Sequence, residues 1–117
     1  MDKFTQSLLE LDGEYVCINP DCKPDKKDWR YSVFDAVHFY PKGLLGKKDP
    51  LRTDPCNGGM LCRYCHDRIH LKTDDPIRGY MFLVKMLDRL KELGRYRWSK
   101  VYPLIIGLAS KQEWRMK

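Results

Sequence analysis

The segment CNGGMLCRYCHDRIH, residues 56–70, decides the fold, because it holds three of the five cysteines and two of the three histidines of the chain. It contains the close pair Cys62-x2-Cys65, and a second close pair, Cys17-x4-Cys22, lies upstream. An odd number of cysteines argues against a disulfide framework, and two close pairs are typical of zinc binding. The spacing therefore predicts a structural zinc ion held by these four thiolates.

Two other ligand sets remain open at this point. His66 follows Cys65 directly and could take the place of Cys17 or Cys22, since imidazole is also a common zinc ligand. Cys56 could enter the site if the upstream pair does not bind; otherwise we expect it to be a small buried residue or free thiol.

Length and composition describe the kind of chain. It has 117 residues with 43% hydrophobic residues, which predicts a single globular domain over residues 1–117. A core of this size is marginal alone, and a structural metal is a common remedy. The longest convincing apolar run, residues 103–109, is far too short to cross a bilayer, and no signal peptide is visible. We expect no membrane contact and a cytoplasmic, intracellular protein.

The net charge of +6 is unevenly spread. Residues 1–75 carry a net charge of −1, whereas residues 76–117 carry +7. Such asymmetry favours a polyanionic partner, although a solvated helical surface explains a charge bias equally well.

Hydrophobic periodicity and turn residues predict an α+β fold. A loop at residues 41–59 is long enough to suggest a function of its own. Asp75 and Pro76 suit the start of a helix that Gly94 would end. We expect helices at 3–11, 62–71, 75–94 and 103–114, and strands at 14–18, 29–40 and 59–61.

The three histidines suggest a second metal. His66 and His70 are four residues apart on the predicted helix, so both imidazoles leave the same face and could chelate a cation. His38 lies on the strand that would pack against this helix. A strand, a loop, a short strand and a helix with histidines so placed form a ββα-metal arrangement.

These motifs carry a resemblance to a family. His38 lies in FDAVHFYPKG, Asn57 stands five residues before Cys62, and Cys62-x2-Cys65-His66 opens the helix. The chain resembles the HNH (ββα-metal) endonuclease superfamily over residues 14–72. It is locally similar to the zinc-stapled phage recombination and junction nucleases of the NinG (Rap) and endonuclease VII types, which would suit a phage origin. Residues 75–117 would form a basic helical extension.

The resemblance implies a role for each residue in DNA cleavage. His38 would be the general base, Asn57 would brace the loop around it, and His66 and His70 would hold a catalytic Mg²⁺, Mn²⁺ or Ni²⁺. The family generally places a metal ligand directly before the base, where this chain has valine. The cation's third ligand would be Asp35 only if the strand bulges, because an odd offset along a regular strand places two side chains on opposite faces.

The expected function is thus a metal-dependent DNA endonuclease with weak sequence specificity and a preference for branched or nicked structures. The main alternative is a catalytically inactive, zinc-stapled module that binds nucleic acid or a protein, and an RNA nuclease is a weaker one. His38 alone could also be a packed strand histidine, His70 a surface histidine, and Asn57-Gly58 a simple turn.

Two further expectations concern the basic part of the chain. An apolar stripe, which consists of Tyr80, Leu83, Val84, Leu87 and Leu90, could close the core of the monomer or form the interface of a homodimer. Six cations are candidates for contacts with DNA phosphates, or for a merely solubilising role: Arg63, Arg78, Lys85, Arg89, Arg95 and Arg97.

Overall fold

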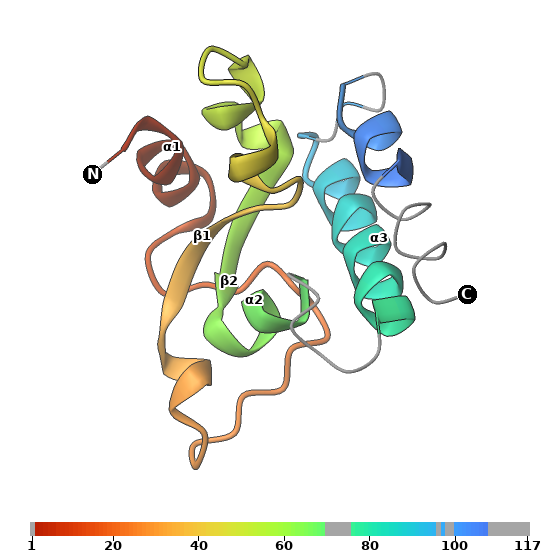
Figure 1. Cartoon of the computed structure of the whole chain (residues 1–117). Helices are drawn as coiled ribbons and strands as arrows, with labels where there is room; N and C mark the ends of the chain where they lie inside the picture. The colour runs from red at the N-terminus through yellow and green to blue at the C-terminus, as the bar shows by residue number, and fades with distance from the viewer. Residues whose placement is uncertain (1, 70–75, 96, 98–99, 108–117) are drawn as a thin grey trace.

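The computed structural model describes residues 2–69, 76–95, 97 and 100–107 (Figure 1). Along the chain come helix α1 (Lys3–Asp12), strands β1 (Phe34–His38) and β2 (Gly58–Cys62), helix α2 (Arg63–Ile69) and helix α3 (Pro76–Glu92). Residues 100–107 are also helical. The α+β class is confirmed. In the described part of the chain, no helix combines the length and the apolar character that a membrane crossing requires.

The two strands form a small antiparallel sheet with α1 on one face and α2 and α3 on the other (Figure 1). Asp35 pairs with Leu61, and His38 pairs with Gly58, in an unbroken register. Because side chains alternate along a regular strand, Phe34 and His38 share the α1 face, and Asp35 lies on the α2 face. The strand does not bulge.

Hydrophobic side chains fill both faces of the sheet. Under α1, Phe4 and Leu8 pack with Met60. The larger core contains Val37 and Leu61 of the sheet, Ile69 of α2, and three leucines of the predicted stripe on α3, namely Leu83, Leu87 and Leu90. These leucines pack within the monomer itself, which is the first of the two roles considered for the stripe, whereas the side chain of Tyr80 lies outside the described part.

A buried ion pair ties α1 to the chain after α3. The Asp12 carboxylate accepts hydrogen bonds from Arg95 at 2.7 Å and from the backbone N–H of Met60 at 3.0 Å. The two charged side chains are only 3% and 10% exposed. Removing one partner of such a pair leaves the other charge buried, so this contact fixes the position of α1 on the sheet.

Of the two strands predicted before the long loop, the first is absent and the second is shorter than predicted. Residues 14–18 form no strand, because only one ladder-like bond, from Ile18 N–H to the Met60 carbonyl at 2.9 Å, reaches them. Residues Trp29–Ser32 form a 3₁₀ turn, since the Asp28 carboxylate accepts a bond from the Arg30 N–H at 3.0 Å. The strand therefore covers only Phe34–His38.

The helix predictions held better. Gly94 has the positive φ of 76° expected of a residue that ends a helix, whereas Asp75 lies outside the described residues. The buried side of α3 differs from the predicted stripe: Phe82 and Met86 belong to it, and Val84 is 44% exposed. The last helix already includes residue 100, and its predicted end lies outside the described residues.

Candidate metal centre and histidine site

The four predicted zinc ligands come together. Cys17 and Cys22 lie on the loop after α1, Cys62 ends β2, and Cys65 lies in the first turn of α2. All four sulfur atoms lie within 4.8 Å of one another. The cluster joins the loop before β1 to the junction of β2 and α2, and it could bind a structural metal such as zinc.

The spacing of the sulfur atoms suits a tetrahedral ion. Zinc–sulfur bonds of about 2.3 Å in a tetrahedron place neighbouring sulfur atoms about 3.8 Å apart. The Sγ atoms of Cys22 and Cys62 are 3.8 Å apart. Asn19, which lies in the loop between the first two cysteines, is buried. Its side-chain nitrogen is 3.6 Å from the sulfur of Cys65.

The electrostatics of the cluster also call for a cation. The hydrogen bond from Cys65 lowers the pKa of Cys17 to about 5. Burial and the nearby charge of Cys17 raise the pKa of Cys22 to about 12, and the bond to Cys17 raises the pKa of Cys65. Among Cys17, Cys22 and Cys65, the thiolate is therefore favoured at Cys17, and a bound dication would stabilise the others as thiolates.

The two alternative ligands do not belong to this cluster. Cys56 is buried, and burial raises its pKa to about 12, which keeps it a thiol. His66 instead contacts Asp35, with its Nδ1 2.9 Å from the carboxylate. The sulfur atoms of the two close pairs are thus the four atoms that meet.

His38 is held in one tautomer. Its Nε2 lies 2.8 Å from the carbonyl oxygen of Arg52, and because a carbonyl only accepts, Nε2 must donate. In the neutral ring the lone pair is then on Nδ1. The ring stacks on Phe4 of α1, with centroids 3.7 Å apart and planes 17° apart. Burial lowers the pKa of His38 below its ordinary value of 6.5.

Asn57 braces the backbone on both sides of the long loop. Its side-chain oxygen accepts from the Tyr40 N–H at 2.8 Å, and its nitrogen donates to the carbonyls of Tyr40 and Leu51 at 3.1 and 3.3 Å. The side chain is fully buried. Its bracing geometry is the one predicted, and it ties the residues after His38 to the segment that carries the Arg52 carbonyl.

Gly58 lets the strand, α1 and the histidine approach closely. A Cβ atom at this position would overlap the carbonyl oxygen of Val37 and lie 2.6 Å from the ring of Phe4. Because Gly58 pairs with His38, any larger residue would push Phe4 off the imidazole. The Asn57-Gly58 dipeptide thus does more than form a turn.

On the other face of the sheet, Asp35 and His66 form a pair. The Asp35 carboxylate accepts from His66 Nδ1 at 2.9 Å and from Arg63 at 2.6 Å. Because a carboxylate only accepts, Nδ1 carries the proton in this hydrogen bond. The lone pair of the neutral ring is then on Nε2, and a neutral imidazole nitrogen with a lone pair is the form that binds metals. His70, the third predicted ligand, lies outside the described residues.

The structure therefore brings two of the predicted metal ligands together and leaves the predicted base across the sheet. His38 contacts α1, whereas Asp35 and His66 meet on the α2 side. Val37, which occupies the position of the usual metal ligand, is fully buried in the main core.

Most of the cations predicted to contact DNA are engaged within the chain. Arg63 binds Asp35, Lys85 binds Asp21, Arg89 donates to the Ile18 carbonyl and to Glu92, Arg95 binds Asp12, and Arg97 binds Asp54. The side chain of Arg78 lies outside the described part. Their contact with DNA stays a prediction, and the five described ones already have partners within the chain.

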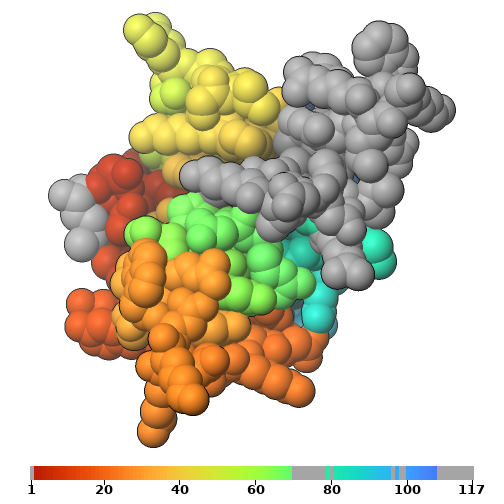
Figure 2. Space-filling view, turned by 60° about the horizontal axis from the view of Figure 1, so that its bottom comes forward, coloured from red at the N-terminus to blue at the C-terminus, as the bar shows by residue number. Residues whose placement is uncertain are grey.

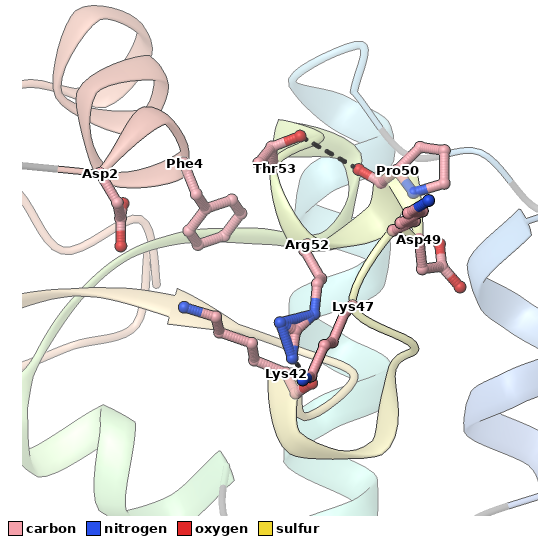
Figure 3. Close-up of a pocket in the computed structure, with 9 residues that line it drawn as sticks. Asp2, Phe4, Lys42, Lys47, Asp49, Pro50, Arg52 and Thr53 are labelled. Atoms are coloured by element: carbon pink, nitrogen blue, oxygen red, sulfur yellow. Dashed lines mark hydrogen bonds between the residues drawn. The ribbon is translucent and has the colours of Figure 1, made fainter.

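Sequence reasoning missed a second group of cations next to His38. Lys42, Lys47, Lys48 and Arg52 line a pocket of about 350 Å³ together with Asp2 and Phe4 of α1 (Figure 3). The signal was present in the long loop, where GKKD follows the histidine motif. Because residues 1–75 as a whole have a net charge close to zero, a count of charges did not reveal this local group of cations.

A comparison of the chain with protein-family models, with curated proteins and with solved structures finds no match.

Proposed function

We propose that the protein is a metal-dependent DNA endonuclease of the HNH type in which His38 is the general base. The observation that carries this proposal is the fixed tautomer of His38. Its Nε2 donates to the Arg52 carbonyl, and its lowered pKa keeps Nδ1 unprotonated near neutral pH. A base with these properties is suited to take a proton from water that attacks a phosphodiester.

Three neighbours support this role by positioning the ring. Phe4 stacks on one face of the imidazole, and the Arg52 carbonyl fixes its rotation about the ring axis. Asn57 binds the backbone of Tyr40, two residues after His38, and of Leu51, directly before Arg52, and so holds the chain next to both residues in place. Such preorganisation lowers the entropic cost of reaching the transition state.

In this proposal His66 would hold the catalytic cation with His70, the further ligand expected from the sequence, and Asp35 would orient the ring of His66. A carboxylate that orients the ring of a metal-binding histidine is a common arrangement, and the described donor set fits it. When bound, a divalent cation neutralises charge on the phosphate and the leaving oxygen. The four-cysteine cluster serves as a separate structural zinc site that fixes α2 to the loop after α1.

Cleavage of supercoiled plasmid DNA tests the proposal. Purified protein should convert the plasmid to nicked circles with added Mg²⁺, Mn²⁺ or Ni²⁺ and should leave it intact without added metal. A strong chelator should not serve as the metal-free control, because it would also attack the cysteine cluster. Absence of nicking with every cation would contradict the proposal.

The pH dependence of cleavage should report His38. Burial, and to a lesser degree the charge of Lys42, lowers the pKa of the ring below 6.5. A general base acts unprotonated, so the rate should rise with pH through this pKa, and the acid limb should have its midpoint below 6.5. Single-turnover rates between pH 4.5 and 8 measure it. A midpoint clearly above 6.5 would argue that another group limits the rate.

A second candidate is a zinc-stapled module that binds DNA without cutting it. The observation that favours it is the burial of Val37 together with the separation of His38 from the Asp35–His66 pair by the sheet. The plasmid assay separates the two candidates, since a binding module would retard the plasmid in a gel without nicking it.

A further inference from the structure

Four cations of the long loop surround a pocket that the proposed chemistry does not use. Lys42, Lys47, Lys48 and Arg52 line it, with Asp2 and Phe4 on the side of α1 (Figure 3). Figure 3 shows Lys42, Lys47 and Arg52 gathered together, with the two α1 residues across from them. Asp2 already caps α1 by accepting from the Thr5 N–H at 2.7 Å.

These cations lack the internal partners that engage the predicted ones. Within the described residues, Lys42, Lys47 and Lys48 form no ion pair, and all three are exposed. The Asp49 carboxylate in the pocket accepts from the Leu51 N–H at 3.0 Å. The pocket thus carries four cations against the two carboxylates of Asp2 and Asp49, and its net charge is positive.

Arg52 has hydrogen-bonding capacity that the described residues do not use. Its Nε is buried with no acceptor among the described residues, and its terminal nitrogen makes only a long bond of 3.4 Å to the Lys42 carbonyl. An unmade bond on a buried charged group is costly. An anion in the pocket would accept from the terminal nitrogens of Arg52, and guanidinium groups suit phosphate geometry.

The pocket adjoins His38 through two shared residues. Arg52 lines the pocket, and its carbonyl oxygen accepts the hydrogen bond from Nε2 of His38. Phe4 also lines the pocket and stacks on the imidazole. In Figure 2 the yellow segment that carries the cations touches red α1 and lies away from the orange segment of residues 20–33. An anion in the pocket would therefore be next to the candidate base.

We infer that this pocket binds a backbone phosphate of DNA and so places the phosphodiester beside His38. This inference rests on the proposed function only in the choice of DNA as the ligand. It moves the main phosphate contact from the basic C-terminal part of the chain, where Lys85, Arg89, Arg95 and Arg97 are already paired, to the loop between β1 and β2.

A double substitution of neighbouring lysines tests the inference. Lys47→Ala with Lys48→Ala removes two cations of the pocket, and Lys26→Ala with Lys27→Ala is the matched control. Both pairs are exposed lysines followed by aspartate in polar loops, and both variants lose the same net charge. The control pair lies in the orange segment, away from the pocket (Figure 2).

The readout is the affinity for a fluorescent DNA duplex without added divalent cation, measured by anisotropy over a series of salt concentrations. The pocket variant should bind roughly tenfold more weakly, and its salt slope should fall by about 2, since each lost phosphate contact lowers the slope by about 1. The control variant should keep the affinity and slope of the unmodified protein, or nearly so. Equal losses in both variants, or no loss in the pocket variant, would overturn the inference.

This result is separate from the outcome of the cleavage assay. If the pocket variant alone loses binding while the unmodified protein cuts no plasmid, the pocket stands and the nuclease proposal fails. If metal-dependent cleavage occurs and the pocket variant binds DNA normally, the nuclease proposal stands and the pocket inference fails.

Discussion

Removal of zinc is expected to unfold the protein. Through the metal, Cys62 and Cys65 would hold the junction of β2 and α2 to the loop that carries Cys17 and Cys22. Binding of structural zinc contributes roughly 10–16 kcal/mol in small zinc domains. The whole free energy of unfolding of a domain is only about 5–15 kcal/mol. The metal-free chain should therefore lose most of its native structure.

The cysteine outside the cluster gives this prediction a matched control. Cys62→Ser should abolish stoichiometric zinc binding and the cooperative thermal transition in circular dichroism. Cys56→Ser, also at a buried cysteine, should keep the zinc and cost only about 1–3 kcal/mol, the usual effect of placing a polar group in the core. Native-like unfolding of Cys62→Ser, or zinc loss in Cys56→Ser, would contradict the assignment of the ligands.

The sequence predicted those parts of the fold that depend on local patterns. The helices around Leu8 and Leu87 follow apolar periodicity, and the end of α3 follows the conformational freedom of Gly94. The cysteine cluster was predictable because spacing alone limits which thiolates can meet. These features need no knowledge of distant contacts.

The parts that were missed depend on long-range contacts. Residues 14–18 have the composition of a strand, but their backbone is directed toward the cysteine cluster and pairs with β2 only at Ile18. Arg95 looks like a surface cation in the sequence, yet Asp12, 83 residues away, draws it into a buried ion pair. A charge count cannot tell a paired arginine from a free one.

In the candidate site, too, local patterns predicted some features, and those that depend on distant contacts were missed. The motif drew attention to Asn57, whose hydrogen bonds reach residues on both sides of the long loop, and its role in a nuclease site stays a prediction. The sequence rule of alternation also predicted that Asp35 and His38 would lie on opposite faces of a regular strand, and the register has no bulge. The stacking of Phe4 on His38 was not predictable, because α1 precedes the histidine by a long irregular segment.

Substitution of His38 is the change with the largest expected effect on activity. His38→Ala should lower the single-turnover rate of plasmid nicking by about 10²–10⁴-fold, the usual contribution of general base catalysis. It also removes the stack on Phe4, however, and so could act by loosening α1. His38→Phe is the sharper variant, since an aromatic ring can keep the stack while it provides no nitrogen for the proton.

Three measurements on His38→Phe decide between a catalytic and a structural role. The variant should keep the zinc content of the unmodified protein and its DNA affinity without added metal, because neither depends on the base. Its cleavage should fall as far as that of His38→Ala. Added imidazole should restore part of the rate, since a small base can occupy the position of the lost nitrogen. If His38→Phe instead cuts at the rate of the unmodified protein, the ring only packs against Phe4, and the water must be activated by another group.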